Sequence, residues 1–346
     1  MLSSILIIYT GGTIGMKTDP ATGVLVPFDF RGIYDEFPAI RSLQVRIDVQ
    51  SLTPVIDSSN VTPALWLHLA ELIRDNYARY DGFVVLHGTD TMSYTASALS
   101  FLLENLAKPV VFTGSQIPIG VLRTDGRENL SRRSKSPLRT TRRGRSYPRC
   151  RSTSRTGCSA PTAPSSRAPR SSPHSAPTTI RRWPKWASIS PSTATTSTAR
   201  HTPTPNSGSP QHWTTACWSS AFFPVCANRC SAPCSRSKGL RAVVLETYGA
   251  GNAPTAPEFI RAVREAVARG LLVMNVTQCS GGRVAMELYE TGRQLQEAGV
   301  ICGHDITTEA AVAKLMYVLG QNLPAERTQR LLRHALRGEF TDAGIA

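Results

Sequence analysis

The chain has 346 residues, enough for two domains of ordinary size, and a formal net charge of +15. That charge first indicates a nucleic-acid partner, but residues 131–238 hold 16 Arg and 3 Lys with no Asp or Glu. The rest of the chain holds 20 basic and 24 acidic residues, which is the balance of an ordinary, mildly acidic soluble protein. The overall charge is therefore no argument for nucleic-acid binding by the folded part of the chain.

The cysteine pattern and the first residues exclude further classes of protein. Six of the eight cysteines lie in residues 131–238, and no pair of C-x-x-C units has zinc-ribbon spacing. We therefore expect neither a metal site nor a disulfide framework. The N-terminus lacks the basic and apolar regions of a secretory signal, and no apolar run reaches the ~18 residues of a membrane span. These features predict a cytoplasmic protein with no membrane partner.

The first expected element is a buried strand over residues 5–9, which ends in the small-residue loop T-G-G-T-I-G at 10–15. Glycines after a strand let backbone N–H groups approach a ligand or an oxyanion closely. The threonines are the only side chains of this loop that can act as a nucleophile. An ordinary turn or a phosphate-binding loop explains the same residues, so the loop alone leaves its chemistry open.

Three further strand-and-loop units follow in the first third of the chain. Strands are expected at 43–52, 82–86 and 109–113, with helices from 63 and over 93–106. The loops after these strands read D-S-S at 57–59, H-G-T-D-T at 87–91 and G-S-Q at 114–116. Strands that alternate with helices predict a parallel sheet, in which ligands bind beyond the carboxyl ends of the strands. We therefore expect the four polar loops to meet at one edge of the sheet.

Each of these motifs also has a purely structural explanation. Asp57, or the pair Thr89 and Asp90, can cap a helix, and His87 can be a buried histidine with satisfied hydrogen bonds. Four polar loops on one edge of a sheet are a stronger indication of a site than any one motif.

Alternation of strands and helices resumes after residue 238. Strands are expected at 242–246 and 271–276, and helices over 257–269 and near 307–319 and 324–336. The loop after the first of these strands reads Y-G-A-G-N-A-P at 248–254. These elements predict a second, smaller α/β domain.

Five motifs, in this order, resemble those of the type I (cytoplasmic) bacterial L-asparaginases. They are Y-T-G-G-T-I-G-M at 9–16, D-S-S at 57–59, L-H-G-T-D-T-M at 86–92, F-T-G-S-Q at 112–116 and Y-G-A-G-N-A-P at 248–254. The resemblance covers residues 1–130 and 239–346, about two thirds of the chain. It implies a two-domain α/β fold, with a larger, mostly parallel N-terminal sheet domain and a smaller C-terminal α/β domain.

The resemblance also implies the hydrolysis of L-asparagine to L-aspartate and ammonia through a threonine acyl-enzyme, without a metal or a cofactor. By position, Thr13 is the nucleophile, and Thr89 and Asp90 are the second threonine and the aspartate that holds the substrate amino group. Asp57, Ser58 and Ser59 are implied to hold the α-carboxylate. Family members form homodimers or homotetramers, in which the second domain of one protomer completes the site of another.

Two departures from the family pattern concern the activation of the nucleophile. The family has a tyrosine in a mobile loop, but residues 23–27 read G-V-L-V-P here, with no tyrosine between Tyr9 and Tyr34. The role of that tyrosine therefore cannot be transferred to this chain. The family's lysine near the second threonine falls within residues 131–238, where nothing matches.

Residues 131–238 contain 23 Ser, 16 Arg, 15 Thr and 14 Pro among 108 residues, so they are not expected to fold natively as written. The family has about as many residues here, which indicates replacement and not insertion. The underlying codons can be read in a shifted frame, in which the third base of each codon is joined to the first two bases of the next. In that frame, codons compatible with residues 131–137 can encode I-A-A-L-E-I-A, and those of residues 176–187 can encode S-D-N-Y-P-P-L-A-E-V-G. The same shift over 149–166 admits the strand-like E-V-S-I-Y-F and a polar loop. We interpret this segment as the family's gene translated out of frame.

If the sequence is literally correct, the chain lacks the family's lysine and the strands after Thr113, and its activity is expected to be impaired. Two alternative functions stay open. One is the amidase subunit of a tRNA-dependent amidotransferase, which shares the threonine loops. The other is a basic, disordered nucleic-acid-binding scaffold, which depends wholly on residues 131–238.

Overall fold

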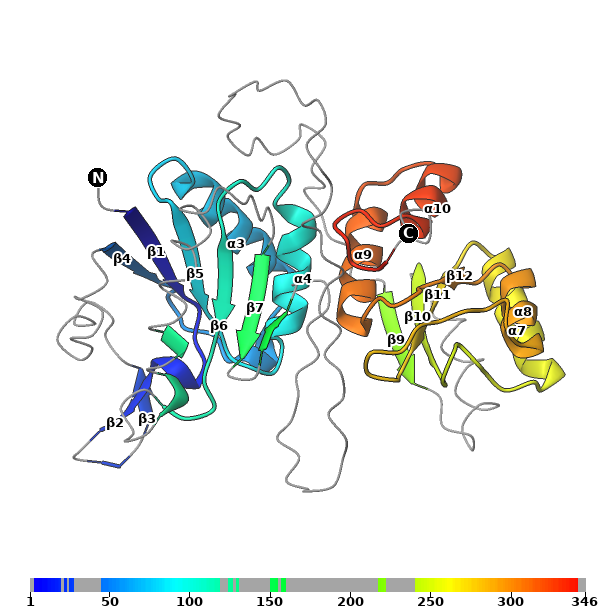
Figure 1. Cartoon of the computed structure of the whole chain (residues 1–346), viewed down its shortest axis with the longest axis horizontal. Coiled ribbons are helices and arrows are strands. Elements are labelled where there is room, and N and C mark those ends of the chain that lie inside the picture. The colour runs from blue at the N-terminus through cyan, green and yellow to red at the C-terminus, as the bar shows by residue number, and fades with distance from the viewer. Residues whose placement is uncertain are drawn as a thin grey trace, which may run out of the picture.

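The computed structural model describes residues 3–19, 22–23, 25–27, 45–118, 124–126, 129–130, 150–154, 157–159, 217–221 and 240–341. These residues form two α/β units that lie side by side (Figure 1). The N-terminal unit contains a six-stranded sheet with the order β4-β1-β5-β6-β7-β8, and the C-terminal unit a four-stranded sheet with the order β12-β11-β10-β9. The predicted two-domain α/β fold is therefore confirmed.

The N-terminal sheet is built from strands that end at the same level. They are β1 (Ser3–Tyr9), β4 (Val45–Ser51), β5 (Gly82–Leu86) and β6 (Val110–Thr113). All four pair in parallel, with Tyr9 opposite both Ser51 and Leu86, and Leu86 opposite Thr113. Because the strands end together, the loops that follow them start from one edge of the sheet, as predicted.

Helices α3 (Pro63–Asn76) and α4 (Met92–Leu102) pack on this sheet through a core that includes Leu69, Phe83 and Leu99. Pro63 suits the first position of α3, because the N–H that proline lacks would have no partner within the helix there. The helix predicted over 93–106 ends four residues early in the structure. Leu103 is not helical, and Asn105 has a positive φ of 52°.

The C-terminal sheet contains β10 (Ala242–Thr247), β11 (Leu272–Thr277) and β12 (Ile301–Cys302). Its helices are α7 (Pro257–Ala268), α8 (Glu290–Glu297), α9 (Thr308–Gly320) and α10 (Ala325–Arg333). Each predicted element is present within a few residues. The sequence did not predict α8, β12 or the hairpin of β2 (Met16–Thr18) and β3 (Leu25–Pro27), because elements this short carry little periodicity.

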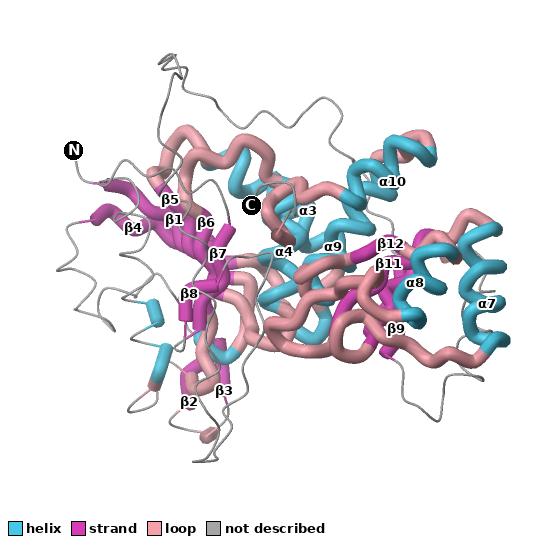
Figure 2. Tube along the Cα trace, turned by 45° about the vertical axis from the view of Figure 1, so that its right-hand side comes forward, coloured by secondary structure: helices cyan, strands magenta, loops and turns pink. Residues whose placement is uncertain are grey.

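Helix α4 joins the two units, because it packs against α9 of the C-terminal unit (Figure 2). The rings of Phe101 on α4 and Tyr317 on α9 stack with their centroids 5.6 Å apart. The Tyr317 hydroxyl donates a hydrogen bond of 2.6 Å to Glu104, which also pairs with Arg337 at 2.9 Å. The two units therefore share an apolar core with a polar border.

Three described strands come from the segment 131–238: β7 (Cys150–Ser154), β8 (Gly157–Ser159) and β9 (Cys217–Ala221). Strand β7 pairs in parallel with β6, and β9 pairs in parallel with β10. The expectation that the segment 131–238 lacks the sheet strands that follow Thr113 is therefore wrong for the backbone. A sheet edge offers N–H and C=O groups to any extended chain, whatever its side chains. The other residues of this segment lie outside the described ranges, so its failure to fold natively stays a prediction.

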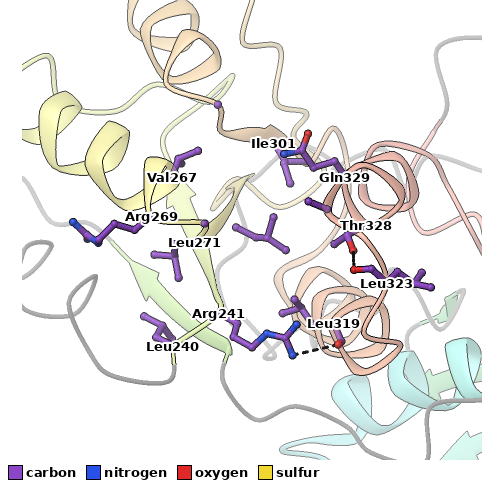
Figure 3. A pocket seen from close by; sticks show the side chains of 14 residues that line it. Leu240, Arg241, Val267, Arg269, Leu271, Ile301, Leu319, Leu323, Thr328 and Gln329 are labelled. Atoms are coloured by element: carbon purple, nitrogen blue, oxygen red, sulfur yellow. Dashed lines mark hydrogen bonds between the residues drawn. The ribbon is translucent and has the colours of Figure 1, made fainter.

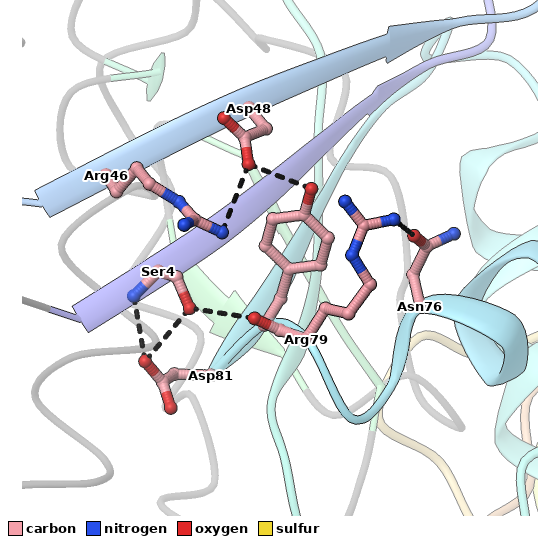
Figure 4. A network of polar contacts seen from close by, with 7 residues as sticks. Ser4, Arg46, Asp48, Asn76, Arg79 and Asp81 are labelled. Carbon is pink, nitrogen blue, oxygen red and sulfur yellow. Dashed lines mark hydrogen bonds and ion pairs between the residues drawn. The ribbon is translucent and has the colours of Figure 1, made fainter.

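The amino ends of the N-terminal strands are closed by polar contacts (Figure 4). The Ser4 N–H donates to Asp81 at 2.8 Å, and the Tyr80 hydroxyl donates to Asp48 at 2.9 Å. Arg46 pairs with the same Asp48 carboxylate at 3.4 Å. These contacts lie at the end of the sheet opposite the polar loops, so they stabilise the sheet and are not part of the candidate site.

A cavity of about 510 Å³ lies at the amino ends of β10, β11 and β12 (Figure 3). Leu240, Leu271 and Ile301 contribute to its walls, and Arg241 lies at its border and donates to Leu319 O at 3.4 Å. Because ligands of parallel sheets bind at the carboxyl ends of the strands, this cavity is not part of the candidate site.

Candidate active site

Backbone hydrogen bonds tie the loops at the carboxyl edge of the N-terminal sheet to one another. Thr10 N–H donates to Leu86 O at 3.0 Å, and Ile56 N–H donates to Thr10 O at 2.8 Å. His87 N–H donates to Thr113 O at 2.9 Å. The four loops therefore meet, as the sequence predicted.

Two glycines explain how closely these loops approach. Gly12 has a φ of 87°, and a Cβ there would lie 2.6 Å from the Gly88 Cα. A Cβ on Gly88 would in turn lie 2.4 Å from the Ser58 Oγ. The loop after β1 thus contacts the loop after β5, which contacts the turn at 57–60. Any larger side chain at these two glycines would force the loops apart.

Thr13 begins a single 3₁₀ turn directly after the two glycines, and its side chain is half-buried. The buried Tyr9 lies beneath this turn, and its hydroxyl donates to Gly12 O at 3.4 Å. Burial raises the pKa of Tyr9 to about 12, so its hydroxyl stays a neutral donor at physiological pH. Among the residues that the structure describes, none forms a hydrogen bond with the Thr13 hydroxyl.

The turn at 57–60 presents Ser58 to the second loop. Asp57 caps the 3₁₀ helix Ser58–Asn60 by accepting hydrogen bonds from the Ser59 N–H at 2.9 Å and the Ser59 hydroxyl at 3.0 Å. These hydrogen bonds lower the pKa of Asp57, which keeps it ionised. The buried Ser58 donates its hydroxyl to the Asp90 carboxylate at 2.8 Å. The capping explanation is therefore correct for Asp57, while Ser58 points to the loop after β5.

The loop after β5 carries the other predicted residues. The N-cap of α4 is Thr91, so the capping explanation is wrong for Thr89 and Asp90. The Thr91 hydroxyl instead donates to Ser58 O at 2.6 Å and holds the two loops together. The Gln116 amide, from the loop after β6, donates to the Thr89 hydroxyl at 3.2 Å. Thr89 and Asp90 are thus left at the open edge of the sheet.

The structure brings Thr13, Ser58, Thr89 and Asp90 onto one sheet edge, and it orients Ser59 toward Asp57. Sequence reasoning missed Tyr9 and Thr91. Both support the site from beneath, and only their three-dimensional contacts distinguish them from ordinary strand and cap residues. Within the described ranges, no group of three or more His, Cys, Asp or Glu side chains could hold a metal ion. None of the helices there is long and apolar enough to cross a membrane.

Comparisons with known proteins agree with this architecture. The family model "Asparaginase, N-terminal" matches residues 4–135, and the model "Glutaminase/Asparaginase C-terminal domain" matches residues 225–332. Together the two matches cover both α/β units and more than half of the chain.

Individual relatives match over nearly the whole length. L-asparaginase 1 of Escherichia coli (strain K12) is 37% identical over 354 residues, which cover 98% of each protein. The crystal structure of L-asparaginase I from Vibrio cholerae superimposes with a TM-score of 0.78 at 36% identity, covering 99% of this chain and 100% of that one. A glutamyl-tRNA(Gln) amidotransferase subunit of Metallosphaera sedula is 31% identical over 96% of this chain and 76% of its own length. The chain therefore belongs to the asparaginase family.

Proposed function

We propose that this chain hydrolyses the side-chain amide of L-asparagine to L-aspartate and ammonia. The observation that carries the proposal is the meeting of four polar loops, with Thr13 on one side and the Ser58–Asp90 pair on the other. A free amino acid substrate needs one anchor for its amino group, one for its α-carboxylate and a nucleophile near the carbon that reacts. Two relatives named L-asparaginase, each matched over nearly their full length, support the choice of substrate.

Asp90 and the serines bind the amino-acid head of the substrate. The Asp90 carboxylate is exposed and is held by the Ser58 hydroxyl, so it pairs with the α-ammonium group. Ser58 and Ser59 bind the α-carboxylate, and their hydroxyl protons, which point to Asp90 and Asp57 in this structure, turn to the substrate when it binds. Asp57 acts through Ser59, because a direct contact between two carboxylates would be repulsive. This assigns Asp57 a positioning role in substrate binding.

Thr13 carries the covalent chemistry. Its Oγ attacks the amide carbon, the hydroxyl proton passes to the amide nitrogen, and the C–N bond breaks, so that ammonia leaves and an ester forms on Thr13. Water then hydrolyses this ester and releases aspartate. Backbone N–H groups at Gly12 and Thr89 stabilise the oxyanion, a contribution worth about 3 kcal/mol per donor. Thr89, whose hydroxyl is held by Gln116, acts as the second threonine.

The turnover of the chain as written is low in this proposal, because the nucleophile lacks its helpers. A hydroxyl needs a group that accepts its proton, and no described residue hydrogen-bonds to the Thr13 hydroxyl. We attribute the missing lysine to translation of 131–238 out of frame. The support for this is the shifted frame itself, which admits family-like sequence over residues 131–137, 149–166 and 176–187. Resequencing tests it, and an intact single frame through this region would contradict it.

An ammonia-release assay with L-asparagine tests the activity. We expect slow turnover by the chain as written, none above background with Thr13→Ala, and a large gain when the frame is restored over 131–238. Mass spectrometry of the quenched enzyme is expected to show an acyl group on the peptide that contains Thr13. Equal rates for the wild type and Thr13→Ala would contradict the proposed nucleophile.

The remaining expectations stay proposals of the same kind. We place the protein in the cytoplasm as a homodimer or homotetramer without a nucleic-acid partner, and light scattering at several concentrations tests the assembly.

The amidotransferase alternative is less well supported, because the chain matches only 76% of the length of the Metallosphaera sedula amidotransferase protein. Release of ammonia from glutamine that depends on a tRNA would favour that alternative.

A further inference from the structure

His87 is a buried titratable residue that the proposed chemistry does not use. It is the first residue after β5, its side chain is 1% exposed, and both of its ring nitrogens have partners. Nδ1 lies 2.7 Å from Gly88 O, and Nε2 lies 3.0 Å from the Thr95 hydroxyl. The ring also makes an edge-on contact with Phe112, at a centroid distance of 6.2 Å. Its position is therefore fixed from three sides.

The partners of His87 determine which ring nitrogen carries the proton. A carbonyl oxygen only accepts hydrogen bonds, so Nδ1 must donate to Gly88 O. The Thr95 oxygen already accepts a hydrogen bond of 3.0 Å from Trp66 Nε1, which is only a donor. The Thr95 proton is then directed at His87 Nε2, which accepts it as the unprotonated nitrogen of a neutral imidazole. A continuous chain of hydrogen bonds thus runs from Trp66 on α3 through Thr95 on α4 to Gly88.

The last hydrogen bond of this chain controls the orientation of one peptide group. The peptide unit between Gly88 and Thr89 is planar and trans, so its C=O and N–H point in opposite directions. Because His87 holds the carbonyl on the buried side, the Thr89 N–H is directed away from the imidazole. No described residue accepts a hydrogen bond from this N–H. An unpaired donor with a fixed direction at the site edge is suited to stabilise an oxyanion.

We infer that His87 is a positioning residue, which aims the Thr89 N–H at the oxyanion of the acyl-transfer step through its Nδ1–H bond to Gly88 O. This inference rests on the proposed amidase activity and adds a residue to it. His87 touches neither the substrate nor the nucleophile. It acts by keeping the peptide from rotating, so its loss lowers kcat more than it raises KM.

Two substitutions at His87 separate this role from simple packing. In His87→Asn the side-chain NH₂ occupies the place of Nδ1 and still donates to Gly88 O, whereas in His87→Gln the NH₂ occupies the place of Nε2 and the donor to Gly88 is lost. We expect His87→Asn to keep kcat for L-asparagine within about threefold of wild type, and His87→Gln to lose at least tenfold with KM changed by less than threefold. Packing alone predicts the reverse order, because Asn leaves the larger cavity. Equal kcat values for the two variants, or a smaller loss in His87→Gln, would overturn the inference.

A second measurement does not depend on activity. In the full-length wild-type chain labelled with ¹⁵N-histidine, we expect the His87 ring to show a protonated Nδ1 and an unprotonated Nε2. The signal is assigned by its absence in His87→Asn. The opposite tautomer, or a ring that exchanges between the two, would overturn the inference. If the wild type releases no ammonia, the proposed activity fails, while this spectrum still decides the role of the His87 hydrogen bonds.

Discussion

The loops that follow the two parallel sheets are held in the same way but carry different chemical groups. In the N-terminal sheet, the His87 ring donates to Gly88 O at 2.7 Å. In the C-terminal sheet, the buried Asn275 donates its amide to Gly251 O at 3.2 Å and accepts a hydrogen bond from Thr247 at 2.7 Å. In both places a buried side chain holds a glycine carbonyl just beyond a strand.

The difference lies in what the held loops present. The N-terminal loops carry Thr13, Ser58 and the ionisable Asp90, whereas the C-terminal loop Tyr248–Asn252 carries no acidic or basic side chain. A fixed backbone is therefore common to both places, and compared with the loop Tyr248–Asn252 the N-terminal loops add a nucleophile and a charged anchor. The following predictions test this comparison, from the largest expected effect to the smallest.

The largest effect is expected from the hydroxyl of Thr13. Thr13→Ala is expected to lower the kcat for L-asparagine at least 10³-fold without changing the melting temperature, because the nucleophile is lost and nothing is packed differently. The control is Thr277→Ala in the C-terminal sheet, which loses the hydrogen bonds to Gly249 O and from the Cys279 N–H and keeps kcat within about fivefold. Similar losses in both variants would show that the comparison between the loops is wrong.

A smaller loss is expected from the close approach of the loops. Gly12→Ala places a Cβ 2.6 Å from the Gly88 backbone, and we expect about a 10²-fold loss of kcat, since a shift of ~1 Å at a site has this effect. Gly281→Ala is the matched control, because Gly281 also has a positive φ, of 75°, but has no atom within 4 Å of its Cβ position. It is expected to lower stability by ~1 kcal/mol and to leave kcat unchanged. Unchanged kcat in Gly12→Ala would mean that the two loops need not touch.

The C-terminal clamp is expected to affect stability and not chemistry. Asn275→Leu leaves Gly251 O without its side-chain donor in a buried place, which is expected to cost about 1–3 kcal/mol of unfolding free energy in urea titrations. The exposed Gln296→Ala is the control, with an expected change below ~0.5 kcal/mol. If Asn275→Leu abolished turnover while remaining folded, the C-terminal loop would have a direct part in catalysis.

The smallest effect concerns acid pH. Burial lowers the pKa of His87, against the opposing effects of its bond to Gly88 O and the nearby Asp90 charge. Below a pH of about 6.5 the unfolded chain therefore binds a proton at His87 that the folded chain does not. The free energy of unfolding then falls as the pH drops, by at most ~1.4 kcal/mol per pH unit. Urea unfolding at several pH values is expected to show a shallower acid loss in His87→Asn than in wild type. The exposed His68→Asn serves as a control and is expected to leave the slope unchanged.

The sequence predicted the parts of this architecture that depend on local pattern. The apolar runs of β1, β5 and β6 and the alternation with helices predicted a parallel sheet, and with it the edge on which Thr13, Ser58 and Asp90 meet, but not the spatial order of the strands. The roles of Tyr9, Thr91 and Asn275 were not predictable. Each depends on a carbonyl that is distant in sequence or lies across a turn, and no residue pattern marks such a contact.

Helix α4 has a consequence for how this protein can be divided. It follows directly from the loop that carries Thr89 and Asp90, and between Met92 and Phe101 the side chains are buried, apart from the half-buried Tyr94. Part of that burial is supplied by α9, which lies more than two hundred residues later in the chain. The N-terminal unit is therefore not a self-sufficient module. If synthesis stopped before α9, it would leave the other apolar face of α4 uncovered beside the reaction centre.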